Sequence, residues 1–328
     1  MRRREFIALL SGAAIAWPSL GLTQHAEQIR RVAVLMGLTQ DDPEAEPRIA
    51  AFKRELQILG WSDRNLRVDF RWSAGDAERA RTYATEVVKL APDAILAHGG
   101  ETLSVMQQQT SLIPIVFVQV SDPIRAGFVR SLARPEGNIT GFTSFEPEMS
   151  GKWLEILKEV APRIGRVLVL QDPTNPAWPG QLRAIDGLAS SFAVEIIPTE
   201  VRGDRDIRHA IEGLAHEGHD GVLVLPNLIS GINRDLIVSL CARYRLPAIY
   251  PYGYFTSRGG LVSYGIDIVD LYRRAAGYVD RILRGTKASE LPVQAPTKFQ
   301  LTINLKTAKV LNLTVPETLI ARADEVIE

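Results

Sequence analysis

A loop that follows an apolar segment carries residues suited to binding a small ligand. The apolar run 94–97 is followed by His-Gly-Gly-Glu-Thr. The paired glycines Gly99 and Gly100 let backbone N–H groups approach a ligand, and the Thr102 hydroxyl would cap a helix and add a donor for a carboxylate. Glu101 could instead meet a ligand ammonium group. The alternative interpretation is a plain tight turn.

Three further loops have the same position after an apolar run. Ser121 and Asp122 follow the run 115–118, and Asn175 and Asn227 follow two later runs. Ser121 offers a hydroxyl and the two asparagines offer amides to a ligand. Asp122 could equally cap a turn before Pro, and the asparagines could be solvated turn residues.

Aromatic residues are densest in the segment 250–255, Tyr-Pro-Tyr-Gly-Tyr-Phe. An aromatic ring in a cleft offers stacking and a phenol hydrogen bond, which suits a flat ligand. We therefore include Tyr250 and Tyr252 among the ligand-binding candidates. Aromatic packing at a hinge between domains would produce the same pattern.

Motifs of catalysis and of metal binding were sought and are absent from the sequence. It contains no GxGxxG, GxxxxGK[ST], HExxH or GxSxG pattern. His209, His216 and His219 lack the spacing that places zinc ligands on one helix face. We expect no catalytic residues, no metal and no cofactor, which disfavours a reductase or hydrolase of the α/β class.

The overall composition excludes further classes of function. Lys plus Arg and Asp plus Glu number 38 each, so no basic surplus exists to neutralise a nucleic acid. The one cysteine, Cys241, excludes an intrachain disulfide and follows an apolar spacing that indicates a packed thiol. The amount and mixture of apolar residues are those of an ordinary globular protein.

The first residues form a different kind of sequence. Arg2, Arg3 and Arg4 precede a short apolar run and then small residues, which is typical of an export signal. The order Arg3-Arg4-Glu-Phe-Ile matches the twin-arginine pattern. We expect 1–28 to be the signal, with an uncertain cleavage site, and the mature protein to be periplasmic and not lipidated, because no cysteine follows the run.

Short apolar runs then alternate with segments of helical periodicity, which predicts an α/β fold with parallel sheets. The buried strands are expected at 32–36, 94–97, 115–118, 167–170, 194–197 and 222–225. The alternation occurs twice, with turn-forming residues between the two sets. We expect a first lobe of 29–138 plus 260–288 and a second lobe of 139–259 plus 289–328, with hinges near 133–141, 256–262 and 286–292.

Several short segments of the sequence together resemble one known family. They occur in that family's order over nearly the whole chain, and they are Val34-Leu-Met36, Ala91-Pro-Asp-Ala-Ile95, Ser121-Asp-Pro123, Gly137-Asn-Ile-Thr-Gly-Phe142, Gly151-Lys-Trp-Leu154, Tyr264-Gly-Ile-Asp267 and Asn304-Leu-Lys-Thr-Ala308. The sequence is similar to the ABC transporter substrate-binding proteins of the tryptophan/tyrosine type. Gly37, which directly follows the first of these segments, and Asp267, which ends another, join the ligand-binding candidates.

The resemblance implies two doubly wound parallel-sheet lobes joined by three crossings, the type I periplasmic-binding fold. It also implies a monomer that binds a small organic ligand, such as an amino acid, and passes it to an inner-membrane ABC permease. A periplasmic ligand sensor for a membrane signalling partner uses the same fold and remains the alternative. We expect the loop of Gly99 to Thr102 and Ser121 to hold a ligand carboxylate without a fixed positive charge, and Tyr250 or Tyr252 to contact its other end.

Overall fold

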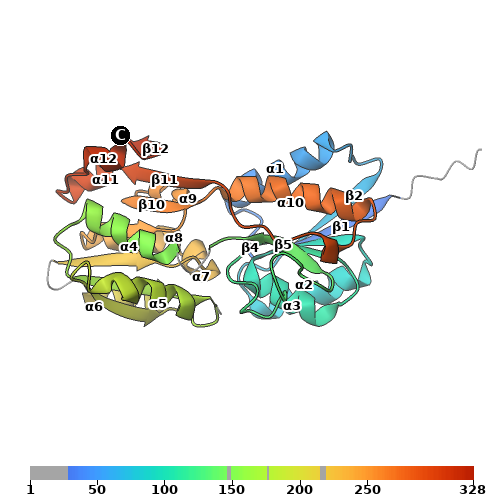
Figure 1. The fold of residues 1–328 in the computed structure, drawn as a ribbon, viewed down its shortest axis with the longest axis horizontal. Coiled ribbons are helices and arrows are strands. Elements are labelled where there is room, and N and C mark those ends of the chain that lie inside the picture. Colours follow the sequence, from blue (N-terminus) through green and yellow to red (C-terminus); the bar gives the residue numbers. More distant parts are fainter. Residues whose placement is uncertain (1–28, 146–148, 176, 215–218) are drawn as a thin grey trace, which may run out of the picture.

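The computed structural model describes residues 29–145, 149–175, 177–214 and 219–328, which form two α/β lobes side by side along the long axis of the molecule (Figure 1). Each lobe is built on its own sheet. We call the lobe with strand β1 the first lobe and the lobe with strand β6 the second lobe.

The first lobe contains a five-stranded sheet in the order β2-β1-β3-β4-β5, in which every pair is parallel. Its strands are β1 (Arg30–Met36), β2 (Leu66–Trp72), β3 (Ala94–His98), β4 (Ile115–Val120) and β5 (Ile139–Thr143). The runs in β3 and β5 are buried along their whole length, because helices cover both faces of a parallel sheet.

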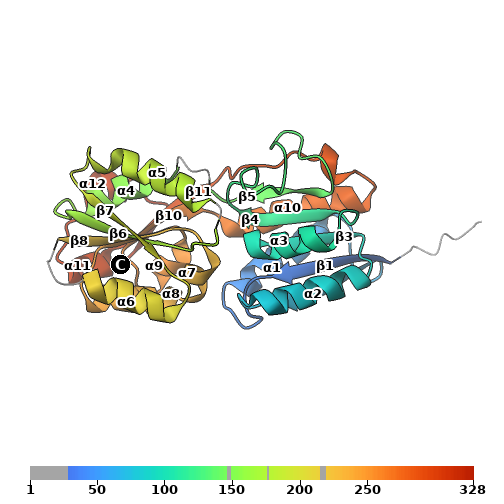
Figure 2. The same ribbon diagram turned by 90° about the horizontal axis from the view of Figure 1, so that it is seen from below.

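Four helices cover the two faces of this sheet. Helices α1 (Ala45–Ile58) and α10 (Ile268–Leu283) pack against each other, and α10 also contacts β3, β4 and β5. Helices α2 (Ala77–Lys89) and α3 (Gly99–Gln109) pack together on the opposite face (Figures 1 and 2). The carboxyl ends of β1, β3 and β4 therefore open between two helical layers.

The second lobe contains a seven-stranded sheet in the order β12-β11-β10-β9-β8-β6-β7. All its pairs are parallel except β10 with β11. Its strands are β6 (Arg166–Gln171), β7 (Glu195–Glu200), β8 (Asp220–Val224), β9 (Ala248–Tyr250), β10 (Val262–Ile266), β11 (Phe299–Asn304) and β12 (Glu325–Ile327).

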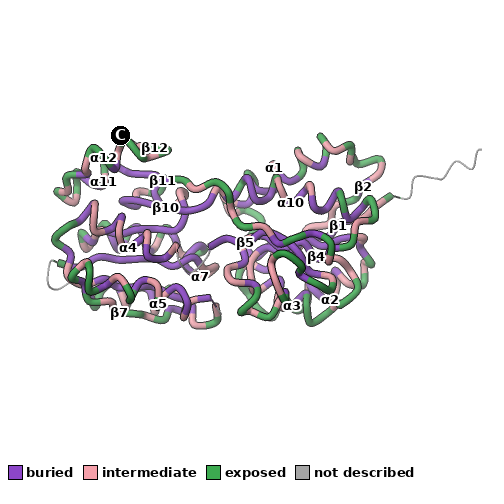
Figure 3. The backbone as a smooth tube through the Cα atoms, viewed as in Figure 1, coloured by how far each residue is buried: buried purple, intermediate pink, exposed green. Residues whose placement is uncertain are grey.

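Eight helices and one 3-10 turn complete the described second half of the chain. They are α4 (Met149–Val160), α5 (Trp178–Ala189), α6 (Asp204–Leu214), α7 (Leu228–Ile232), α8 (Arg234–Arg243), α9 (Gly253–Ser257), α11 (Leu305–Val310), α12 (Glu317–Ile320) and the turn η1 (Ala288–Glu290). The central strands of both sheets run through the buried interior, while the edge strands β2, β7 and β12 and the outer helix faces are more exposed (Figure 3). No helix in the described ranges is long and apolar enough to cross a membrane.

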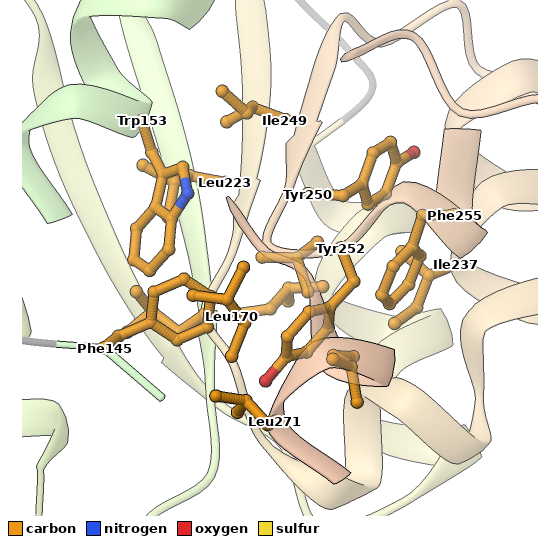
Figure 4. Packing of buried hydrophobic residues seen from close by; sticks show 14 of the residues in the cluster. Phe145, Trp153, Leu170, Leu223, Ile237, Ile249, Tyr250, Tyr252, Phe255 and Leu271 are labelled. Atoms are coloured by element: carbon orange, nitrogen blue, oxygen red, sulfur yellow. The ribbon is translucent and has the colours of Figure 1, made fainter. Parts of the chain in front are cut away.

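Aromatic side chains fill the core of the second lobe beside the crossings. Phe145 contacts Trp153 and Tyr252, with ring centroids 5.1 and 5.6 Å away (Figure 4). The Trp153 indole N–H donates to the carbonyl oxygen of Tyr264 at 2.6 Å. These contacts tie the start of α4 to the strands of the second sheet.

The chain crosses between the lobes at other points than the sequence predicts. Strand β5 pairs with β4 in the first sheet, and β10 pairs with β9 and β11 in the second, so the expected boundaries at 138 and 260 each misplace one strand. Two crossings follow β5 and β10, and the third follows Gln294, which still hydrogen-bonds to β5 of the first sheet. Turn-forming residues reveal where a chain turns, but they carry no information on which sheet the next strand joins.

The lobes contact each other through an ion pair and two glycine positions. Arg234 of α8 donates from Nη1 and Nη2 to the Asp42 carboxylate of the first lobe at 2.9 and 3.1 Å, and both side chains are buried. A Cβ at Gly75 would lie 2.7 Å from Ile232 Cδ1, and one at Gly37 would lie 3.2 Å from Leu228 Cδ2. The side chains of helix α7 therefore pack against two positions of the first lobe that are glycines and have no side chain. The structure is that of a closed molecule.

The ion pair generates a prediction about closure. In the Asp42→Asn variant the Arg234 guanidinium would stay buried without a carboxylate if the lobes remained closed, which is unfavourable. We expect this variant to open and its radius of gyration to rise in small-angle X-ray scattering. Asp235→Asn is the matched control, because Asp235 pairs with Arg258 inside the second lobe. An equal radius of gyration in the two variants would contradict this role.

His98, the last residue of β3, ties two strand ends together. Its Nδ1 accepts a hydrogen bond from the Gly37 N–H at 3.1 Å, so in the neutral ring the proton is on Nε2. Burial, together with the nearby Arg48 charge, lowers the pKa of His98 from 6.5 to about 3. As the pH falls, the His98 ring is protonated in the unfolded chain before it is protonated in the folded protein. Protonation of His98 therefore favours unfolding below about pH 6.5.

A pH dependence of stability follows. From about pH 7 to about pH 5 the His98 contribution should lower the free energy of unfolding by about 2 kcal/mol. His98→Asn keeps an acceptor for Gly37 and removes the titration, so its free energy of unfolding in urea should fall less over this range. His209→Asn, at an exposed position, should behave as the parent does. Parallel pH curves for parent and His98→Asn would refute the assignment.

Candidate functional site

A cavity of about 490 Å³ lies between the lobes at the carboxyl ends of the strands. This is where ligands bind in open α/β sheets, because the loops that leave the strands meet there. Many of the predicted residues line it, and they are Gly99, Gly100, Glu101, Ser121, Asn175, Asn227 and Tyr252. Their placement follows from the one feature that the sequence does reveal, the ends of the apolar runs.

Thr102 and Tyr250 do not line the cavity. Thr102 is fully buried inside the first turn of α3, where its hydroxyl donates to the carbonyl oxygens of His98 and Gly99 at 2.8 and 3.3 Å. Tyr250 is the last residue of β9, and its ring stacks on Phe255 inside the second-lobe core (Figure 4). Neither side chain is available to a ligand in this structure.

Gly37, Asp122 and Asp267 are also placed outside the lining. Gly37 lies behind His98, to which its N–H donates. Asp122 accepts a hydrogen bond from the Arg125 N–H at 3.1 Å, and so caps a turn. Asp267 is the N-cap of α10 and accepts from the Asp270 N–H at 3.0 Å. Aspartates after strands often serve as caps, because their carboxylates satisfy free backbone N–H groups.

Arg48, which sequence reasoning missed, is the most buried cation of the lining. It projects from the first turn of α1 and is 4% exposed. Its Nη1 donates to Gln119 Oε1 at 3.3 Å, and its Nη2 lies 3.7 Å from Glu44 Oε2. These are long contacts for a guanidinium that carries five donors. Nothing in the local sequence distinguishes this arginine from the exposed Arg54 of the same helix.

Tyr254 connects Arg48 to the second lobe. The guanidinium carbons of Arg48 and Arg234 each lie 5.9 Å from the centre of its ring, within the range of cation–π attraction. Arg234 also lines the cavity, and its Nε is buried without a hydrogen-bond partner among the described residues. Two buried cations therefore border this end of the cavity.

Gln119 lies between several of these groups. Its backbone is in the left-handed region at φ 57°, a conformation that costs free energy in any residue but glycine. This backbone leaves the carboxamide beside Arg48, His98 and Tyr252. The interruption of the apolar run 115–118 by a glutamine was the available signal for this residue.

The remaining wall mixes apolar and acidic surfaces. Apolar contact is offered by Leu38, Val105, Phe128, Leu228 and the buried ring of Tyr252. Burial raises the pKa of the Tyr252 hydroxyl to about 12, so it acts as a neutral donor and acceptor. Glu101 and Asp172 supply carboxylates on the side of α3. The cavity thus suits a molecule with an apolar body and polar ends.

The cysteine and the histidine cluster have no reactive or metal-binding arrangement within the described residues. Cys241 is buried in α8, and burial raises the pKa of its thiol to about 12, which makes it a packed side chain and not a nucleophile. No group of three or more potential metal ligands occurs within the residues that the structure describes. The histidines at 209 and 219 are in the described part, whereas His216 lies outside it.

Comparison with known proteins identifies the family. The family model described as ABC transporter substrate binding protein matches residues 32–327. The chain is 25% identical over 283 residues to a tyrosine-binding protein of Clostridioides difficile (strain R20291), which covers 85% of this chain and 81% of that protein.

Solved structures share the fold. A conserved domain protein from Vibrio cholerae matches with a TM-score of 0.85 at 24% identity, over 91% of this chain and 100% of that one. An ABC domain in complex with L-Trp from Streptococcus pneumoniae matches with a TM-score of 0.84 at 22% identity, over 91% and 99%. The fold is the type I periplasmic-binding fold, as the resemblance implies. The chain belongs to the family of ABC transporter substrate-binding proteins.

Proposed function

We propose that this protein captures a small carboxylate, in particular an aromatic amino acid, between its lobes and delivers it to an ABC importer. The ligand carboxylate binds Arg48, and the apolar body lies against Tyr252 and the neighbouring aliphatic side chains. The protein acts by binding and closing, with no catalytic step. It works as a monomer in the periplasm.

The under-paired guanidinium of Arg48 is the observation that carries this proposal. A buried charge is costly unless a counter-charge and hydrogen bonds satisfy it. Arg234 has such a partner in Asp42, whereas the carboxylate nearest to Arg48 is 3.7 Å away. A ligand carboxylate can accept two parallel N–H bonds from a guanidinium, which is the strongest geometry for such a pair.

The position proposed here for the ligand carboxylate differs from the one that the sequence suggested. The loop of Gly99 to Thr102 was expected to hold the carboxylate, but Thr102 is buried and Glu101 adds negative charge at that point. An anion there would meet the carboxylate of Glu101 without a cation of its own lobe beside it, whereas at Arg48 it meets a guanidinium whose nearest acid, Glu44, is 3.7 Å away. Electrostatics therefore favours the α1 side of the cavity for the carboxylate.

The relatives support an aromatic amino acid as the ligand. One is described as a tyrosine-binding protein, and another was solved in complex with L-Trp. Tyr252, Tyr254 and Phe128 line the cavity here and offer the faces that such rings pack against. Delivery to a permease follows from the family's role in ABC transport.

Arg48→Met tests the carboxylate anchor. Loss of a charged hydrogen-bond partner should weaken binding of L-tyrosine or L-tryptophan about ten- to hundredfold, as measured by titration calorimetry. The melting temperature of the empty protein should fall little, since the contacts that the variant loses, to Gln119 and Glu44, are long. Arg54→Met, at an exposed position of the same helix, is the control.

A ligand screen by thermal shift accompanies this test. A bound amino acid at about 100 times its dissociation constant should add about 2.7 kcal/mol of stability. If an identified carboxylate ligand binds Arg48→Met as tightly as the parent, the anchor is misplaced. If no amino acid or aromatic acid shifts the melting temperature, the proposed ligand class is wrong.

Export is proposed from Arg3 and Arg4, which lie outside the described residues. The twin-arginine receptor reads the paired guanidinium groups and not merely two positive charges. Replacing both arginines by lysine should therefore leave the precursor in the cytoplasm, which fractionation and immunoblotting would detect. Normal periplasmic accumulation of this double variant would exclude the twin-arginine route.

A further inference from the structure

The ligand cavity continues out of the inter-lobe cleft along one face of α3. Its lining includes Gly100, Ser104, Gln107 and Gln108, which follow one another along this helix. Helix α3 begins at the cleft, where β3 ends, and runs along the first lobe away from the second (Figure 2). A helix rises about 1.5 Å per residue, so the lining reaches about 12 Å along α3 from the cleft.

The turn that follows β4 forms the facing wall. Ala126 and Phe128 of this turn line the cavity. The Gln107 carboxamide donates from Nε2 to the carbonyl oxygen of Gly127 at 3.1 Å, which holds the turn against α3. All of these residues belong to the first lobe. We call this part of the cavity the α3 groove, and it consists of Gly100, Ser104, Gln107, Gln108, Ala126 and Phe128.

The two ends of the cavity differ in their access to solvent. At one end Arg48 and Arg234 are 4% and 6% exposed, and the ring of Tyr252 is also buried. At the far end of the α3 groove Gln107 and Gln108 are exposed. The cavity is therefore closed at the Arg48 end and open to solvent at the end of the α3 groove.

We propose that the α3 groove receives an extension on the nitrogen of the bound amino acid, so that the protein also binds N-acylated or peptidyl forms of its aromatic ligand. This inference rests on the proposed function and specifies the ligand class further. With the carboxylate at Arg48 and the side chain against Tyr252, the nitrogen is the remaining substituent of the α-carbon that can carry a chain.

The space above the start of α3 allows such a chain to pass from the cleft into the groove. A Cβ added at Gly99 or at Gly100 would have no atom within 4 Å. The first turn of α3 therefore presents bare backbone to the cavity, and the chain of a ligand can lie across it.

The lining of the α3 groove suits a neutral chain that carries amide groups. Ser104, Gln107 and Gln108 offer a hydroxyl and two carboxamides, which both donate and accept hydrogen bonds. The side chains of Ser104 and Gln108 form no hydrogen bond with another described residue. Ala126 and Phe128 add apolar contact. None of the six groove residues is charged, so a peptide backbone fits this lining better than a second ionic group does.

The length of the groove sets the size of the extension. An extended peptide spans about 3.3–3.6 Å per residue, so a groove of about 12 Å holds about three residues. The walls of the groove belong to the first lobe alone, and the Asp42–Arg234 ion pair between the lobes involves none of them. The lobes can therefore close on the aromatic residue while the extension leaves along α3.

Three probes test the α3 groove by titration calorimetry. They are L-tyrosine, N-acetyl-L-tyrosine and N-acetyl-L-alanyl-L-alanyl-L-tyrosine, and the same series is repeated with tryptophan. We define the extension ratio as the dissociation constant of the second probe divided by that of the third. In the parent this ratio should be at least ~10, because the added residues reach the amide and apolar groups of the groove.

Ala126→Trp fills the groove and should bring the extension ratio to about 1, while the affinity for the free amino acid stays as in the parent. Arg125→Trp is the matched control, because Arg125 is exposed and does not line the cavity. Its extension ratio should equal that of the parent.

Gln108→Ala removes one carboxamide without filling the groove. It should lower the extension ratio about fivefold through the loss of a hydrogen bond. Gln109→Ala, at the neighbouring exposed position outside the lining, should leave the ratio unchanged. Circular dichroism of each variant establishes that it is folded before binding is measured.

The outcomes separate this inference from the proposed function. If the parent binds a free aromatic amino acid but neither acetylated probe, the proposed function stands and the α3 groove is overturned. An extension ratio of about 1 in the parent, or one that neither Ala126→Trp nor Gln108→Ala lowers, also overturns it. If the longest probe binds, the free amino acids do not, and Ala126→Trp abolishes the binding, the groove stands and the free amino acid is the wrong ligand. Binding of no probe at all overturns both.

Discussion

The Arg48 guanidinium is almost fully buried, its nearest carboxylate oxygen, on Glu44, is 3.7 Å away, and the arrangement of the cavity depends on this charge. The same charge helps to keep His98 neutral, so the ring presents an N–H donor at all physiological pH values. The tyrosines nearby are buried and therefore also neutral. Arg48 and Arg234 place two positive charges at this end of the cavity, and the carboxylate of Glu44 is 3.7 Å from Arg48 Nη2, so a ligand anion can still approach the Arg48 guanidinium.

Closure depends on charges that are paired between the lobes. Asp42 and Arg234 satisfy each other only when the lobes meet, and α7 fits over glycine positions that have no side chain. These contacts stabilise the closed state. A ligand that binds the closed lobes more tightly than the open ones shifts the equilibrium toward closure, which is how a binding protein converts occupancy into a change of shape.

Neighbouring residues divide between the core and the cavity. Tyr250 ends a strand and packs into the second lobe, whereas Tyr252 begins the next turn and reaches the cleft. Glu101 and Thr102 are adjacent in α3, yet the Thr102 hydroxyl donates to the backbone carbonyl oxygen of His98 whereas Glu101 lines the ligand cavity. Rotation of about 100° per residue along a helix is enough to separate such neighbours.

The sequence by itself determined the fold class, the family, most buried strands and the loops that would border the ligand, since apolar runs and their ends record burial directly. It did not predict β2, β5, β9 or β12, nor the sheet to which β10 belongs, because these depend on contacts far apart along the chain. Only the tertiary structure singled out Arg48, Gln119 and Asp172. Their roles arise from the charges and surfaces that the other elements bring to them, and no local pattern encodes that.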